Sequence, residues 1–121
     1  MKVFDTHADI GMDVLIKVDL NEKNILKTHH LNKLHQGDVQ GVNMACFFEG
    51  HETLKTAKKM ISELKKEITQ NEKSIHLSLD GSIDSSKLTA IMSIEGMCFI
   101  KSKPEEILDW AYLQGVRIGS L

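Results

Sequence analysis

The sequence lacks the features that mark several classes of protein. It has no charge excess, because 15 Lys and Arg balance 17 Asp and Glu to a net charge of −2, which argues against a nucleic-acid partner. Aromatic residues make up only 5%, too few for a surface that stacks bases. No apolar stretch approaches the ~20 residues of a membrane span, and polar residues interrupt the start too early for a secretory signal. We therefore expect a cytoplasmic protein with no nucleic-acid or membrane partner.

Cysteine is also scarce, with only Cys46 and Cys98, each in or beside an apolar run. No pair has the close spacing of zinc-knuckle ligands, so we predict two reduced, partly buried thiols, although the spacing leaves a disulfide open. With 41% hydrophobic and 26% charged residues, residues 1–121 are expected to form a single domain with its own core.

The hydrophobic pattern predicts an alternation of strands and helices. Strands are expected over residues 2–10, 39–48, 88–96 and from 116 onward, and amphipathic helices over 51–72 and 103–115. Residues 74–86 hold a short alternating piece, and the polar segment up to about residue 35 is predicted to form loops and short helical turns. This order predicts parallel βα units with right-handed crossovers.

The start and end of the second helix carry local signals. Ser102 and Glu105 fit a capping box. Pro104 suits the first turn and Gly115 suits the stop at the C-terminal end.

Residues that could carry chemistry lie at two expected strand ends. In the stretch FDTHADI, His7 and Asp9 should project to one side of the strand, with Asp5 one step behind. An imidazole beside a carboxylate can bind one divalent metal, although a polar strand end bonded to nearby loops would explain the same residues. Glu95 follows an apolar run, where a carboxylate is costly unless it is paired or binds a cation. A solvent-facing or lysine-paired carboxylate is the alternative for Glu95.

The other histidines give weaker signals. His29, His30 and His35 match no common metal-site spacing and are predicted to be exposed loop residues. His51 follows the strand at 39–48, so it is a candidate for contacting a substrate at the same mouth as Glu95. His76 is predicted to be an ordinary strand residue, and no glycine-rich phosphate loop or G-x-S-x-G motif occurs.

Three segments, in this order, resemble the renal or membrane dipeptidases, a family of zinc-dependent dipeptidases with an amidohydrolase-like barrel. FDTHADI resembles the opening His-x-Asp strand of that family, and LNKLHQGDVQGVNMACFF resembles its second-strand region. IMSIEGMCFIKSKPEEILDWAYLQGVRIGSL resembles its Ile/Val-Glu-Gly strand with the helix and strand that follow. The chain departs from the family at Asn43, where Gln is common, and at Met97-Cys98, where a more polar pair is common.

The resemblance implies an α/β fold, namely the N-terminal half of a (β/α)8 TIM-type barrel with parallel strands and helical crossovers. It implies that His7 and Asp9 bind one zinc ion and that Glu95 bridges two. The implied activity is hydrolysis of dipeptides or similar small amides through a metal-bound hydroxide, in the full-length protein. Two further histidines and a proton-transfer Asp are expected beyond residue 121, so no catalytic residue is assigned within the chain, and Asp5 is given only a supporting role.

Two alternatives stay open. A related amidohydrolase that acts on another amide or on a lactone would share these first-half motifs. The chain could also be a non-catalytic fragment, because it stops inside an apolar strand at Leu121. A half barrel leaves strand edges and apolar faces uncovered, so such a fragment would associate with itself as a homo-oligomer or rearrange.

Overall fold

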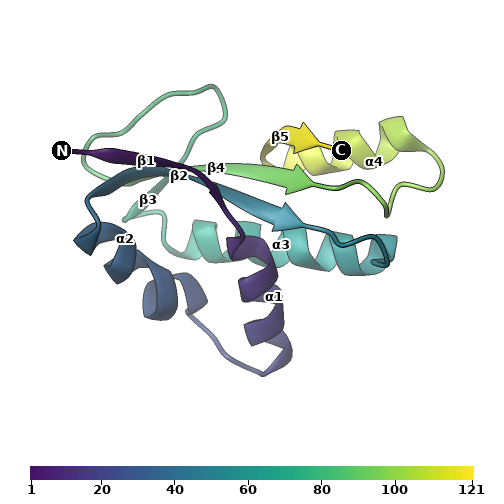
Figure 1. Cartoon of the computed structure of the whole chain (residues 1–121), viewed down its shortest axis with the longest axis horizontal. Helices are drawn as coiled ribbons and strands as arrows, with labels where there is room; N and C mark the ends of the chain where they lie inside the picture. Colours follow the sequence, from purple (N-terminus) through teal and green to yellow (C-terminus); the bar gives the residue numbers. More distant parts are fainter.

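The chain forms one parallel β-sheet with helices packed along one of its faces (Figure 1). A computed structural model describes all residues from 1 to 121. The strands are β1 (Val3–Ala8), β2 (Val39–Phe47), β3 (Ile75–Leu77), β4 (Leu88–Glu95) and β5 (Val116–Ser120). The helices are α1 (Ile10–Asp19), the π-helical segment η1 (Leu26–Leu31), α2 (Asn32–Gln36), α3 (Leu54–Gln70) and α4 (Pro104–Gln114). The predicted α/β class, with parallel strands joined by helical crossovers, is confirmed.

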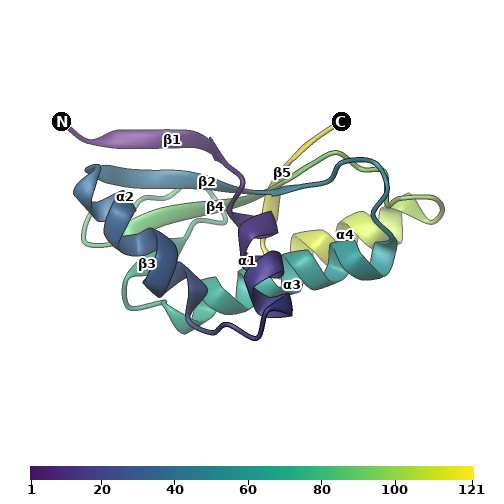
Figure 2. The same cartoon turned by 60° about the horizontal axis from the view of Figure 1, so that its bottom comes forward.

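Apart from the short β3, the strands lie in the sheet in the order of the chain. All pairs are parallel, and β1, β2, β4 and β5 lie next to one another in sequence order. The short β3 pairs with the first residues of β4, whereas β5 pairs with its last residues, so β3 and β5 share the edge of β4 that β2 leaves free. In Figure 2 all four α-helices lie below the sheet. A doubly wound sheet would instead carry helices on both faces.

The hydrophobic core lies between the helices and one face of the sheet, which we call the helix face. A cluster of 22 buried residues joins α1, α3 and α4 to the central strands. The strands contribute alternate residues, as a pleated strand requires: Val42, Met44 and Cys46 from β2, and Ala90, Met92 and Ile94 from β4. The Val, Ile and Met side chains among these each stabilise the fold by about 1.5–3 kcal/mol when fully buried.

The intervening residues of the same strands point to the opposite side, which we call the open face. On β2 and β4 the open face carries Gly41, Asn43, Ala45, Phe47, Thr89, Ile91, Ser93 and Glu95. No helix covers this face (Figure 2). Polar side chains occur on it, although Asn43, Thr89 and Ser93 are buried, whereas the core residues on the helix face are apolar.

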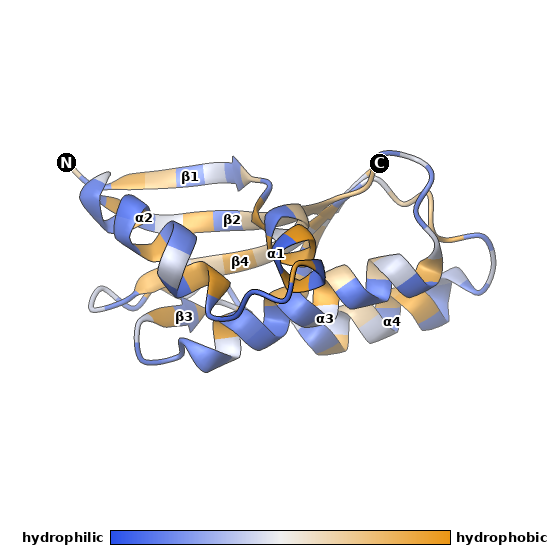
Figure 3. Cartoon of the chain, turned by 90° about the horizontal axis from the view of Figure 1, so that it is seen from below, coloured by the Kyte–Doolittle hydropathy of each residue, from blue (hydrophilic) through white to orange (hydrophobic).

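Helices α3 and α4 form largely as predicted. In α3 the side chains of Met60, Ile61 and Leu64 are buried, and Thr53 caps the helix by accepting the N–H of Thr56 at 3.2 Å. Figure 3, which looks onto the helices, shows mainly hydrophilic colouring along α3. The charged residues of α3 thus lie on its solvated side, as the amphipathic pattern indicated.

At the ends of α4, Pro104 occupies the first turn and Gly115 ends the helix at φ +110°, as predicted. The capping box at Ser102 and Glu105 was wrong. Lys103 is the N-cap residue, and no side chain caps the helix. Its left-handed backbone, at φ +50°, turns the chain so that Ser102 lies one residue too early.

The segment before β2 is more helical than predicted. It forms α1, η1 and α2 instead of loops and short turns. Val14 and Leu26 are fully buried against the sheet, and the side chain of Glu67 accepts the N–H of Leu26 at 2.9 Å. A few apolar contacts and a partner from α3 thus stabilise helices whose own apolar period is weak.

Both cysteines are free, with Cys46 buried and Cys98 partly buried, as predicted. Burial raises the pKa of the Cys46 thiol to about 12. None of the helices combines the length and apolarity that crossing a bilayer requires.

Close packing of α1 on β2 depends on Gly11. A Cβ at this position would lie 2.6 Å from Cys46 Sγ and 2.9 Å from the carbonyl oxygen of Ala45. Gly11→Ala should therefore push α1 away from β2 and lower the free energy of unfolding by about 1–3 kcal/mol, measured by urea denaturation. Gly37→Ala is the control, because Gly37 has an ordinary φ of −80° and should tolerate a methyl group. Equal stability of the two variants would contradict this packing.

Candidate metal centre

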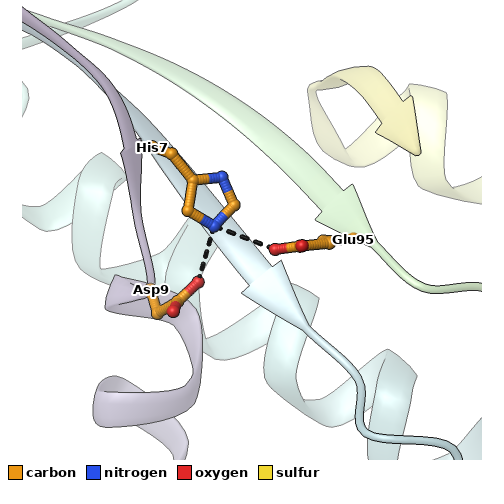
Figure 4. A group of neighbouring side chains, drawn as sticks. All are labelled: His7, Asp9 and Glu95. Carbon is orange, nitrogen blue, oxygen red and sulfur yellow. Dashed lines mark hydrogen bonds and ion pairs between the residues drawn. The ribbon is translucent and has the colours of Figure 1, made fainter. Parts of the chain in front are cut away.

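The carboxyl ends of β1 and β4 bring three predicted residues together, as Figure 4 shows. His7 lies near the end of β1, Asp9 is the residue before α1, and Glu95 is the last residue of β4. Parallel strands end at one edge of a sheet, where functional side chains of α/β folds gather. The topology therefore joins residues that are 88 positions apart in the chain.

The imidazole of His7 lies between the two carboxylates. Its Nε2 is 2.9 Å from Asp9 Oδ1 and 2.9 Å from Glu95 Oε2. The three potential ligand atoms all lie within 4.8 Å of one another. The predicted convergence of His7, Asp9 and Glu95 is thus present, whereas metal binding by them stays a prediction.

The group is accessible from solvent. The side chains of His7, Asp9 and Glu95 are 45%, 55% and 38% exposed. Ion pairs this exposed contribute about 0–1 kcal/mol to stability. One imidazole N–H also cannot make two well-aligned hydrogen bonds at once. The arrangement concentrates two carboxylates on a single nitrogen and adds little to the stability of the fold.

Asp9 also leaves α1 uncapped. Aspartate is among the best N-cap residues because its carboxylate accepts a backbone N–H of the first turn. In this chain Asp9 occupies the N-cap position but makes no such bond, and its Oδ1 lies beside His7 Nε2. The helix thus gives up a contact worth about 0.5–2 kcal/mol, and the carboxylate is directed to His7.

Asp5 does not join this group. Its Oδ1 accepts the backbone N–H of His7 at 3.0 Å. Asp5 therefore contacts the main chain beside the imidazole, in the supporting position that was expected, while the predicted row of three side chains on one side of β1 is reduced to His7 and Asp9.

The remaining histidines lie apart from the group. His51 is 75% exposed, and its Nδ1 lies 3.9 Å from a carboxylate oxygen of Glu49 and of Glu52. It lines a separate hollow of about 330 Å³ together with Phe99 and Lys101. His76 lies in β3, as predicted, with Nε2 3.0 Å from Ser82 Oγ.

For the segment before β2, the prediction of loop histidines was wrong, and of the three only His35 is exposed as predicted. His29 and His30 belong to η1, and His35 belongs to α2. His30 Nε2 lies 2.6 Å from Asp13 Oδ2, and the pair is partly buried. His29 pairs with Glu22 and His30 pairs with Asp13, because η1 folds back beside α1 and the loop that follows it.

Sequence reasoning missed the role of Asn43. Its Nδ2 donates to the carbonyl oxygen of Thr6 at 3.0 Å, which ties β2 to the residue before His7. Asn43 is only 9% exposed. A polar residue inside the apolar run VQGVNMACFF was the available signal, because a buried amide needs a specific partner.

Glu52 is a second missed residue, in the loop after β2. Burial alone would raise the pKa of its carboxyl group, but the backbone N–H groups of Glu49 and Gly50 donate to it at 3.0 Å. These bonds hold the pKa of Glu52 at about 2. The carboxylate thus closes the loop that leads from β2 into α3.

Comparison of the chain with known proteins does not assign it to a family. The chain matches no protein-family model and no curated protein. The resemblance to the dipeptidases thus stays a prediction drawn from three motifs.

The lowered pKa of Glu52 predicts a pH-dependent contribution to stability. The contribution is complete above the ordinary value of 4.5 and is lost as the pH falls toward about 2. Glu52→Gln should lower the melting temperature by a few degrees at about pH 7, and the difference should shrink at about pH 3. Circular dichroism melts would measure it. Glu49→Gln is the control, because the Glu49 carboxylate accepts none of these backbone hydrogen bonds and only approaches the exposed His51 at 3.9 Å. A pH-independent difference for Glu52→Gln would contradict the assignment.

Proposed function

We propose that His7, Asp9 and Glu95 bind zinc in a hydrolase that cleaves dipeptides or similar small amides. The observation that carries this proposal is the position of His7 Nε2, 2.9 Å from a carboxylate oxygen on each side. Imidazole nitrogen and carboxylate oxygen both bind zinc, and a catalytic zinc ion usually has three protein ligands.

The spacing of the donor atoms fits a small divalent ion. Zinc bonds of about 2.0–2.2 Å in a tetrahedral arrangement place two ligand atoms roughly 3.3–3.5 Å apart. The two contacts at His7 are 2.9 Å, so the side chains need to separate by only a few tenths of an ångström. Partial exposure of all three side chains leaves room for that adjustment and for a further ligand.

The topology supports a barrel rather than a doubly wound sheet. Four parallel strands in sequence order with all helices on one face correspond to half of the eight strands of a (β/α)8 barrel. The open face would then line the barrel interior. Active sites of such barrels lie at the carboxyl ends of the strands, which is where His7, Asp9 and Glu95 meet.

The chain's own residues have distinct parts in this proposal. His7 offers a neutral nitrogen, and Asp9 and Glu95 supply negative charge from opposite sides of it. When bound, zinc lowers the pKa of a coordinated water to about 7 and polarises a carbonyl group. The two further histidines and the proton-transfer Asp that the resemblance implies are not among residues 1–121, so dipeptide hydrolysis is proposed for a protein in which another segment supplies them.

The first test is metal binding by the 121-residue chain. Calorimetric titration with zinc should show one site, and His7→Ala or Glu95→Ala should weaken it by more than about 100-fold, beyond the 10–100-fold loss typical of outer-shell changes. His51→Ala is the matched control, because His51 lies outside the group. Binding that both ligand variants leave unchanged would reject the site.

Catalysis is tested on a longer chain that contains the missing ligands, with a panel of dipeptides, acylated amines and lactones. Preference for dipeptides, lost in both ligand variants, would support the proposal. Preference for a lactone or an acylated amine would favour the related amidohydrolase instead.

A second candidate function, self-association, is favoured by the free edges of the sheet. Strand β1 pairs only with β2, and β5 pairs only with β4, so each has backbone groups without a neighbouring strand. Val3, Phe4 and Ile118 are 42%, 43% and 45% exposed on these two strands. Two copies related by a twofold axis could pair each β1 with the partner's β5 and complete eight parallel strands.

Light scattering after size-exclusion chromatography tests this candidate. We expect a dimer at micromolar concentrations, and Ile118→Glu should convert it to a monomer by placing a charge at the joining edge. Leu113→Glu is the control, because Leu113 is exposed on α4, on the helix side of the sheet. A stable monomeric wild-type chain would contradict self-association.

A further inference from the structure

Strand β1 contains a bulge at Thr6 and His7. Asp5 pairs with Val42 and Ala8 pairs with Met44. Two residues of β1 therefore lie opposite one residue of β2, which is Asn43, and this is the pattern of a β-bulge. Bulges are frequent beside active sites, because the extra residue changes the direction of a side chain.

The bulge reverses the alternation of β1. The ring of Phe4 occupies the space above Gly41, on the open face, whereas Ala8 packs against the core on the helix face. In a regular strand, residues four apart would share a face. If β1 were regular, His7 would lie on the face opposite Phe4, which is the helix face. Its imidazole would then point toward the helices instead of toward Glu95.

Two side chains hold the main chain of the bulge. The N–H of His7 donates to Asp5 Oδ1 at 3.0 Å, and the carbonyl of Thr6 accepts from Asn43 Nδ2 at 3.0 Å. A bulge interrupts the ladder and leaves such groups without their regular partners. Asp5 and Asn43 therefore supply hydrogen-bond partners to both polar groups of the peptide between Thr6 and His7.

The environment of Asn43 indicates that its side chain serves mainly to bond the carbonyl of Thr6. Its Oδ1 is buried and has no hydrogen-bond partner, which costs about 1–3 kcal/mol. An apolar side chain of the same shape would avoid this penalty. The one bond that Asn43 makes is to the bulge, so the amide is poorly explained by stability and well explained by the position of His7.

We infer that Asp5 and Asn43 are positioning residues of the proposed metal site, and that they act by holding the bulge that turns His7 onto the open face beside Glu95. The expected effect on metal affinity rests on the proposed function. The claim that Asp5 and Asn43 hold the backbone at His7 does not depend on it. Neither residue touches the metal, so both act through His7.

The test compares metal affinity with stability in variants of the chain. Asn43→Leu keeps the shape, removes the donor and removes the unpartnered oxygen. Its melting temperature should stay the same or rise, while zinc affinity falls about 10–100-fold, as for loss of an outer-shell partner. Asp5→Ala should also weaken binding about tenfold, and Asp5→Asn, which keeps an acceptor oxygen, should restore it to within about threefold.

Asn71→Leu is the matched control. Asn71 Nδ2 donates to the carbonyl of Glu67 at 2.8 Å, also partly buried but at the end of α3, so its loss should leave zinc affinity unchanged. Wild-type affinity in both Asn43→Leu and Asp5→Ala would overturn the inference and leave the metal site intact. So would equal losses in Asp5→Asn and Asp5→Ala.

A readout without metal separates this inference from the proposed function. Hydrogen exchange at the His7 amide should accelerate at least about tenfold in Asp5→Ala and in Asn43→Leu but not in Asn71→Leu. If the wild-type chain binds no zinc, the metal site fails, and this exchange alone decides whether the bulge is held as inferred. Unchanged exchange would overturn the inference.

Discussion

Burial of one face of β2 and β4 is the interaction on which the rest of the structure depends. Met44 and Met92 are fully buried beneath the helices, and the core cluster links them to α1, α3 and α4. Because the helical crossovers pack on this face, β1, β2, β4 and β5 lie in the sheet in chain order, and only the short β3 departs from it. The opposite face then has no helix layer, and polar residues can lie on central strands there without disrupting the core.

The same constraint produces the site. Parallel pairing of β1, β2 and β4 aligns their carboxyl ends, so residues at the ends of β1 and β4 meet although they are far apart in the chain. Gly11 lets α1 approach the backbone of β2 closely, which keeps Asp9 near His7. The position of the proposed ligands thus follows from the packing of the helices on the helix face, although the ligands themselves do not belong to that packing.

The sequence predicts the parts of this arrangement that depend on strong local patterns. The apolar run around Met44 and the three- and four-residue spacing in α3 depend only on neighbours along the chain, and both elements form. The convergence of His7 with Glu95 was also predictable, because parallel strands share an edge at their ends. The metal that would join these residues remains a hypothesis, since geometry alone does not identify an ion.

What the sequence could not predict depends on contacts between distant segments. Helix α1 and η1 are stabilised by Val14 and Leu26 against the sheet and by Glu67 of α3. So few contacts produce only a weak period of apolar residues in the sequence of this segment. The bulge in β1 has no local signature, because two residues of β1 against one of β2 are visible only once the strands pair. The simple rule that alternate residues share a face therefore fails between Phe4 and Ala8.

Three local costs coincide at the carboxyl end of β1. Asp9 leaves α1 without a side-chain cap, Asn43 buries an oxygen without a partner, and two carboxylates share one nitrogen of His7. Elsewhere α3 is capped by Thr53 and the core is well packed, although α4 also has no side-chain cap and Ser78 Oγ and Thr89 Oγ1 are also buried without a partner. Natural proteins violate such rules mainly at functional sites. A cation would relieve the repulsion between Asp9 and Glu95, and the bulge gives His7 the direction needed to share that cation with them.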